Sequence, residues 1–113
     1  MNALLSPGWL LFASVWYFAN GVLHDTFVLI QHKGKYDREL LRLLMDGHVL
    51  LLSGALMFVS YRMLLQDNRY GAVISLILGI FMLIYCGMIF PFLKSIGTML
   101  ISLIVMILSI KYL

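Results

Sequence analysis

Residues 9–30, WLLFASVWYFANGVLHDTFVLI, decide the fold class, because this apolar stretch is as long as a membrane-spanning helix. A spanning helix needs about 20 predominantly apolar residues at a rise of about 1.5 Å each. Three further stretches of the same character follow, and none alternates in the manner of a barrel strand. The sequence therefore predicts an all-α integral membrane four-helix bundle. The predicted helices span about residues 7–32, 38–64, 70–92 and 95–113.

The composition supports this class. The chain has 113 residues, of which 63% are hydrophobic and 12% charged, and its mean hydropathy is +1.01. Soluble domains are about 45–50% apolar and about 25% charged. We expect one transmembrane domain over residues 1–113, with the lipid bilayer as its partner. The net charge of +3 is small and forms no basic stripe, so nucleic acid is not expected.

The N-terminus lacks the positive charge of a secretory signal peptide, so we expect the first apolar stretch to remain as a membrane anchor. Cys86 lies inside an apolar run. Because it is the single cysteine, an intramolecular disulfide cannot form.

Basic residues at the ends of the predicted helices favour one orientation. One side of the bundle carries five of them: Lys33, Lys35, Arg38, Arg42 and Lys94. The other side carries three: Arg62, Arg69 and Lys111. Cytoplasmic loops of inserted proteins are enriched in Lys and Arg. We therefore expect loop 31–42 in the cytoplasm, both termini outside, and the chain in the cell (inner) membrane.

Polar residues gather on one side of the first predicted helix. They are Asn20, His24, Asp25, Gln31 and His32. At about 100° of rotation per residue they fall in one arc of about 140°. Ionisable side chains in membrane helices are costly and face protein or water. We therefore expect this arc to face the interior of the bundle.

The second predicted helix carries Asp46 and His48, which a regular helix points in nearly opposite directions. Asp46 shares a polar stripe with Glu39 and Arg42, whereas His48 lies about 160° away among leucines. Both are level with Asp25 if the two helices form an antiparallel hairpin. On a regular helix the two residues do not serve one site. We expect His48 to find a separate partner in the third helix, in another protomer or in a bound cofactor.

The same hairpin brings the polar arc of the first helix beside the acidic stripe of the second. His24 and Asp25 lie level with Asp46, and His32 lies level with Glu39. We expect a buried His/Asp cluster, with His24 paired to Asp46 or His32 paired to Glu39. Such pairs hold a bundle together when their remaining donors and acceptors are also satisfied.

Other chemistries fit the cluster as well. Histidine and carboxylate exchange protons near neutral pH, so Asp25 or Asp46 could serve a proton-coupled small transporter or a proton-conducting protein. Catalysis on lipid-like substrates is a further class, but no serine or cysteine nucleophile pattern accompanies the cluster, and we do not expect an enzyme.

A metal- or haem-binding membrane anchor is the remaining alternative, and it leaves the cofactor open. Histidine and aspartate are acceptable ligands for zinc or another divalent ion. However, His24 and His32 lie about 12 Å apart along the helix axis, too far for one ion. His48, alone on an apolar face, is the candidate axial ligand of a haem.

In length and four-span layout the chain resembles the small multidrug resistance transporters, which carry an essential acid in their first membrane helix. The resemblance implies that Asp25 would have the role of this essential acid. The acid of that family is a glutamate near the middle of its helix, whereas Asp25 lies nearer one end, and the family's glycine- and proline-rich segments are missing here. The likeness is one of architecture.

Small residues mark the last two predicted helices. Gly71, Ser75 and Gly79 recur at one-turn spacing, a pattern that lets helices approach closely. It favours packing inside the bundle, with a homodimer seam as the alternative. A polar-tinged packing stripe follows in the fourth helix: Ser95, Thr98, Ser102 and Ser109.

A chain of 113 residues is too small to enclose a large substrate cavity alone. We therefore expect a membrane-embedded subunit or accessory protein, working as a homo-oligomer or beside a larger membrane-protein partner.

Overall fold

The computed structural model describes residues 6–89 and 96–113, and it is built of helices. Their bounds are α1 Gly8–Gln31, α2 Arg38–Leu65, α3 Tyr70–Ile89 and α4 Ile96–Tyr112. The prediction of an all-α chain with four helices is confirmed. Lys94 and Ser95, which belong to the basic-residue count and the serine stripe, lie outside the described residues.

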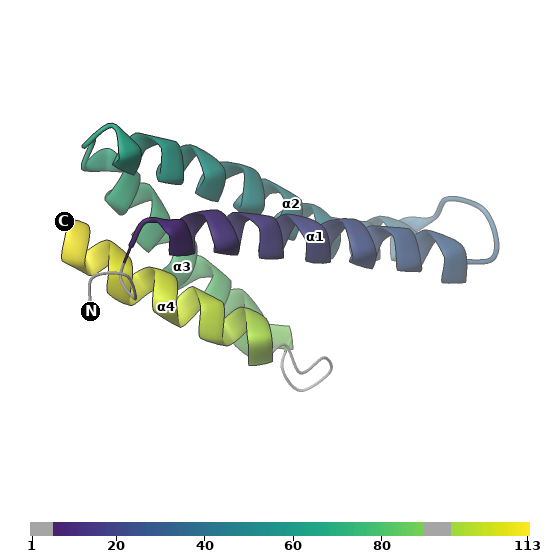
Figure 1. Ribbon diagram of the computed structural model, residues 1–113. Coiled ribbons are helices and arrows are strands. Elements are labelled where there is room, and N and C mark those ends of the chain that lie inside the picture. The colour runs from purple at the N-terminus through teal and green to yellow at the C-terminus, as the bar shows by residue number, and fades with distance from the viewer. Residues whose placement is uncertain (1–5, 90–95) are drawn as a thin grey trace.

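The helices form two hairpins that pack side by side (Figure 1). α1 packs mainly on α2 and α3 mainly on α4, while α2 also contacts α3 and α1 makes a smaller contact with α4. The molecule is elongated, with extents of 50 × 26 × 19 Å.

The hairpins differ in length. α2 has 28 residues and α4 has 17. At about 1.5 Å per residue these lengths correspond to about 42 Å and about 26 Å. Consequently the loop end of the α1–α2 hairpin extends past α3 and α4 (Figure 1). We call this part, residues 21–46, the arm.

Local signals set the ends of the helices around the arm. Asp37 caps α2, because its side chain accepts a hydrogen bond of 2.9 Å from the backbone N–H of Leu40. Gly34, in the loop between α1 and α2, has a φ of 134°, which L-residues with a side chain rarely adopt. At the other end of α2, the side chain of Asn68 accepts a hydrogen bond of 3.0 Å from the N–H of Tyr70 and so begins α3.

The core lies where all four helices overlap. Its largest fully buried side chains include Tyr17, Leu10, Met57, Met82 and Leu108. Buried hydroxyls join the helices within this core. Tyr17 Oη lies 2.6 Å from Ser102 Oγ, linking α1 to α4, and Trp16 donates a hydrogen bond of 3.0 Å to Thr98 on the same pair of helices.

The small residues of α3 pack inside the chain. A Cβ built on Gly71 would lie 2.7 Å from the carbonyl oxygen of Ser60 in α2, and one on Gly79 would lie 2.7 Å from Cγ of Met106 in α4. Between them, Ser75 makes a hydrogen bond with Ser109. The pattern therefore serves packing between α3 and its two neighbours in the same chain.

The outward faces of the helices are apolar. Phe81 on α3 is 65% exposed, and Leu23 on α1 is 67% exposed. Within the described residues, two helices, α2 and α3, are long and apolar enough to cross a membrane. Only 28% of the most apolar part of α2 and 33% of that of α3 is buried, whereas the core helix of a soluble protein is mostly buried.

Candidate functional site

An ion pair between α1 and α2 is the centre of the candidate site. Asp25 Oδ2 lies 3.0 Å from His48 Nδ1. The Asp25 side chain is 13% exposed, whereas that of His48 is 70% exposed. The carboxylate therefore lies between the helices and the imidazole lies at the surface.

The partners of His48 indicate which ring nitrogen carries the proton. Nδ1 lies 3.0 Å from the carbonyl oxygen of Leu44 as well as 3.0 Å from the carboxylate of Asp25. Both partners accept hydrogen bonds, so Nδ1 is the donor. In the neutral imidazole this leaves the lone pair on Nε2, the nitrogen on the far side of the ring from the carboxylate.

Gly47 makes room for this pair. A Cβ at position 47 would overlap Oδ1 of Asp25 and would lie 2.5 Å from its Cγ. Oδ1 is buried and has no hydrogen-bond partner among the described residues. A buried carboxylate oxygen without a partner is costly. Asp25 thus has one oxygen bound to His48 and one enclosed against the backbone of α2.

The expectation that His48 turns away from the first helix is wrong. Asp46 and His48 do point in different directions, but His48 is the one that meets α1. Asp46 lies on the side of α2 that faces α3, where Tyr85 Oη donates a hydrogen bond of 3.2 Å to the Asp46 carbonyl oxygen. The predicted angle between Asp46 and His48 on a regular helix agrees with the structure. The prediction that the Asp46 face of α2 meets α1 does not.

His24 and Asn20, two further residues of the polar arc of α1, have backbone partners. His24 Nε2 lies 3.0 Å from the carbonyl oxygen of Leu43 on α2, so the predicted pair with Asp46 is wrong. The amide of Asn20 donates a hydrogen bond of 2.8 Å to the carbonyl oxygen of Trp16 in its own helix. His24 therefore joins α1 to α2, whereas Asn20 bonds only to the preceding turn of its own helix.

His32 lies at the loop end of the arm and is not paired with Glu39. Its Nε2 lies 3.1 Å from the carbonyl oxygen of Lys35 and 3.7 Å from Oδ2 of Asp37. These contacts hold the loop closed over the end of α1. Glu39 is exposed and makes no side-chain hydrogen bond or ion pair with the residues that the structure describes.

Two adjoining hollows lie along the arm beside Glu39. The first, of about 250 Å³, is lined by Glu39, Arg42, Leu43 and Asp46. The second, of about 320 Å³, shares Glu39 and Leu43 with the first. Its other lining residues are Phe27, Val28, Gln31 and His32. The expected single cluster is therefore divided into an Asp25–His48 pair and an open, mixed-charge surface.

A metal site of three or more protein ligands is not formed over residues 6–89 and 96–113. The described part of the chain holds no group of three His, Cys, Asp or Glu side chains that could bind one ion. The site is thus a carboxylate–imidazole pair without further ionisable ligands.

Glycines that the sequence reasoning passed over shape the site. A Cβ on Gly21 would lie 2.8 Å from the carbonyl oxygen of Gly47, and one on Gly54 would lie 2.9 Å from the backbone N of Phe18. Ser14 donates a hydrogen bond of 2.8 Å to the Gly54 carbonyl oxygen. The sequence does contain a sign of this packing, because Gly47 and Gly54 are seven residues apart and therefore lie on one face of α2.

Comparison with known protein families, with curated proteins and with solved structures finds no significant match to this chain.

Proposed function

We propose that this chain is a small integral membrane protein of four membrane-crossing helices that works as a membrane-embedded subunit or accessory protein, in a homo-oligomer or beside a larger partner. The observation that carries the proposal is the apolar outer surface. Large apolar side chains are exposed on all four helices, as Phe18, Phe58, Phe81 and Ile107 illustrate. A soluble protein rarely exposes such continuous apolar surface.

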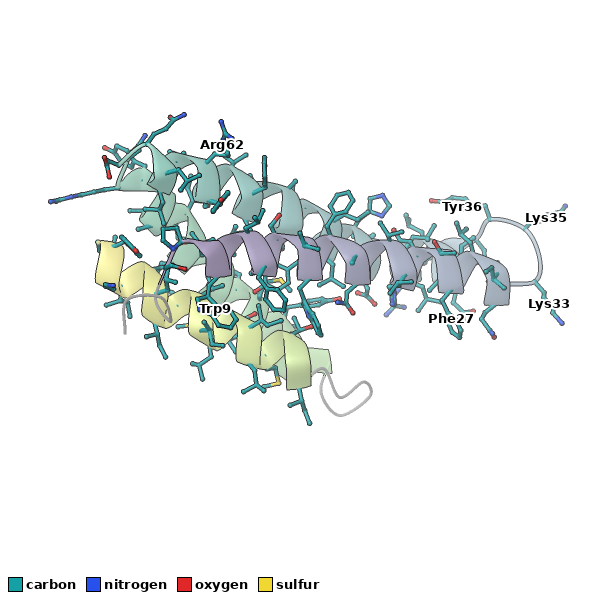
Figure 2. The ribbon with its side chains drawn as sticks, viewed as in Figure 1. Trp9, Phe27, Lys33, Lys35, Tyr36 and Arg62 are labelled. Atoms are coloured by element: carbon teal, nitrogen blue, oxygen red, sulfur yellow. The ribbon has the colours of Figure 1, made fainter. Side chains whose placement is uncertain are left out.

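The hollows along the arm support a subunit over an independent carrier. The two hollows beside Glu39 have volumes of about 250 and about 320 Å³ and are lined by the α1–α2 hairpin alone, so neither lies between the two hairpins. In the proposed orientation, loop 31–42 with its lysines and arginines lies in the cytoplasm and the membrane is the cell (inner) membrane. Lys33 and Lys35 lie at the loop end, and Arg62 lies at the opposite end of the hairpin (Figure 2).

Substitution at two depths tests the membrane assignment. Phe81, in the middle of α3, is 65% exposed, and Met88, near its end, is 71% exposed. Phe81→Asp places a charge at mid-membrane, at a cost of about 2.5–3.5 kcal/mol, whereas Met88→Asp lies near the interface. We expect alkaline carbonate to release much of the Phe81→Asp protein and little of the Met88→Asp protein. Equal retention of both would contradict the proposal that α3 crosses the membrane.

Purification in a mild detergent tests the subunit assignment. We expect the mass measured by light scattering to exceed that of one 12.9 kDa chain with its detergent, as a symmetric oligomer or as a complex. A chain that runs alone and supports cation or proton flux in proteoliposomes would overturn the subunit proposal.

Proton exchange at the Asp25–His48 pair is the second candidate function. The observation that favours it is the 3.0 Å ion pair that carries a surface imidazole on one side and a buried, unpartnered carboxylate oxygen on the other. We expect Asp25→Asn and His48→Gln to abolish a proton flux that Asp46→Asn leaves unchanged, because Asp46 is not part of the pair. Equal flux in all four proteins would remove this candidate.

A further inference from the structure

The side of α2 that faces α3 continues beyond the contact with α3. Ser53 donates a hydrogen bond of 3.3 Å to the sulfur of Met82, and Tyr85 reaches the carbonyl oxygen of Asp46. Tyr85 lies about one turn after Met82 along α3. Arg42 and Glu39 follow on the same stripe, one and two turns further along the arm.

The side chains on this stripe alternate in charge. Arg42 lies three residues after Glu39 and four residues before Asp46, so its neighbours on both sides are carboxylates. None of the three side chains makes a hydrogen bond or an ion pair within residues 6–89 and 96–113. Arg42 and Glu39 are exposed and Asp46 is partly buried. The stripe therefore offers one guanidinium and two carboxylates to an external group.

The hollow over the stripe also has an apolar side. Leu43 lines both hollows, and Phe27, which is 63% exposed, lines the second. A ligand that fits this surface carries a cation and an anion within a few ångströms of one another, next to an apolar chain.

We propose that this surface binds the headgroup of a phosphoethanolamine lipid, with its phosphate on Arg42 and its ammonium on Glu39 or Asp46. Arginine matches phosphate through a planar fork of donors. A primary ammonium donates hydrogen bonds to carboxylates, which the quaternary ammonium of a choline lipid cannot do. The acyl chains then lie along Phe27 and Leu43. This inference rests on the proposed membrane location.

The depth of the stripe agrees with a headgroup. α2 ends at Leu65, and Asp46 lies 19 residues before that end, about 29 Å along the helix axis. This distance is close to the thickness of the hydrocarbon core, about 30 Å. Asp46 is therefore near the boundary of the hydrocarbon, and Arg42 and Glu39 lie at the level of the headgroups.

The loop lysines would recruit a different lipid. Lys33 and Lys35 are exposed and lie at the loop end of the arm (Figure 2). They attract any anionic lipid through charge alone. A preference for phosphoethanolamine over phosphocholine headgroups is what separates the stripe from this general attraction, because both lipids have no net charge.

The test is native mass spectrometry of the purified full chain with equimolar phosphatidylethanolamine, phosphatidylcholine and phosphatidylglycerol of the same acyl chains. We expect phosphatidylethanolamine to bind roughly two- to fivefold more than phosphatidylcholine, as one or two partly exposed ion pairs would give. In Glu39→Gln/Asp46→Asn the ratio should fall to about one. Arg42→Gln should weaken the binding of phosphatidylethanolamine and of phosphatidylcholine, because both carry the phosphate that Arg42 would hold. Arg62→Gln, at the other end of α2, should behave as the wild type.

Equal binding of the two zwitterionic lipids by the wild type would overturn the proposal, as would a phosphatidylglycerol preference that the variants keep. Displacement of the lipid by water-soluble glycerophosphoethanolamine at equal concentration would also overturn it, since the occupant would then be a soluble molecule. Carbonate extraction of the same wild-type preparation is measured first. If the wild type is retained in the membrane but binds phosphatidylethanolamine and phosphatidylcholine equally, the result contradicts the lipid site alone. If carbonate releases the wild type, the result contradicts the membrane location itself.

Discussion

The two hairpins bring their helices together by different means. In α1–α2, glycines allow backbone to approach backbone, since a Cβ on Gly21 or Gly54 would collide with main-chain atoms of the other helix. In α3–α4, the contact is filled by side chains, with Ser75 bonded to Ser109 and Gly79 covered by a flexible methionine.

The difference teaches where an ionisable pair can be placed. The close α1–α2 contact leaves a space above Gly47 that a carboxylate fills, and Asp25 occupies it. The α3–α4 contact has hydroxyls, which satisfy one another without a charge. A hairpin built on glycines can therefore hold a charge between its helices, whereas one built on serines is a packing element.

The largest effect is expected for Gly54→Ala. The new Cβ would lie 2.9 Å from the backbone N of Phe18 and 2.9 Å from the carbonyl oxygen of Ser14, so α1 and α2 must separate. We expect a loss of about 3 kcal/mol in the free energy of unfolding, measured by denaturing detergent. Gly87→Ala is the control, because a Cβ there meets nothing within 4 Å, and its stability should not fall. Equal stability of the two variants would break the comparison.

A smaller effect is expected for Gly47→Ala, because the atoms that its Cβ meets belong to the side chain of Asp25. Asp25 must swing out and lose His48, at a cost of about 2 kcal/mol. In an Asp25→Ala background the same substitution should cost nothing. A double-mutant cycle measures this coupling, and additive costs would show that Gly47 does not make room for Asp25.

Gly79→Ala probes the other hairpin at an equivalent position. Its Cβ would lie 2.7 Å from Cγ of Met106 and 3.2 Å from the carbonyl oxygen of Ser102. Methionine adapts its shape readily, so we expect a cost of about 1 kcal/mol in the same unfolding assay. A cost as large as that of Gly54→Ala would mean that both hairpins depend on backbone approach. Gly79→Ala/Met106→Ala, which removes the obstructing side chain, provides the control for the clash itself.

The smallest effect is expected for the hydroxyl bond that joins the hairpins. Tyr17→Phe and Ser102→Ala each remove one side of a buried hydrogen bond of 2.6 Å. Measured couplings of such bonds in membrane bundles average about 0.6 kcal/mol. We expect a coupling of that size from a double-mutant cycle, and a coupling above about 2 kcal/mol would be inconsistent with this role.

Much of the architecture was predictable from the order of apolar stretches. Their lengths and separations indicate four helices, and the structure has four. The depth of the polar residues was predictable too, because an antiparallel hairpin with a short loop has little freedom in register. The ion pair of Asp25 with His48 confirms that these two residues lie at one level.

The pairing of individual residues was not predictable in the same way. Rotation about a helix axis gives the angle between Asp46 and His48, but it does not say which of the two faces the neighbouring helix. That choice depends on where the helices approach most closely, and Gly47 and Gly54 decide it. An assignment led by polarity alone favoured Asp46, whereas close packing brings His48 beside α1.

The length of α2 has a consequence for the proposed membrane location. A hydrocarbon layer of about 30 Å takes up about 20 of the 28 residues of α2. About eight residues, or about 12 Å, then extend past the hydrocarbon at the loop end of the hairpin. In that location a partner that binds loop 31–42 would be held at a fixed distance from the lipid tails, because a continuous helix joins the loop to the membrane-crossing part of the chain.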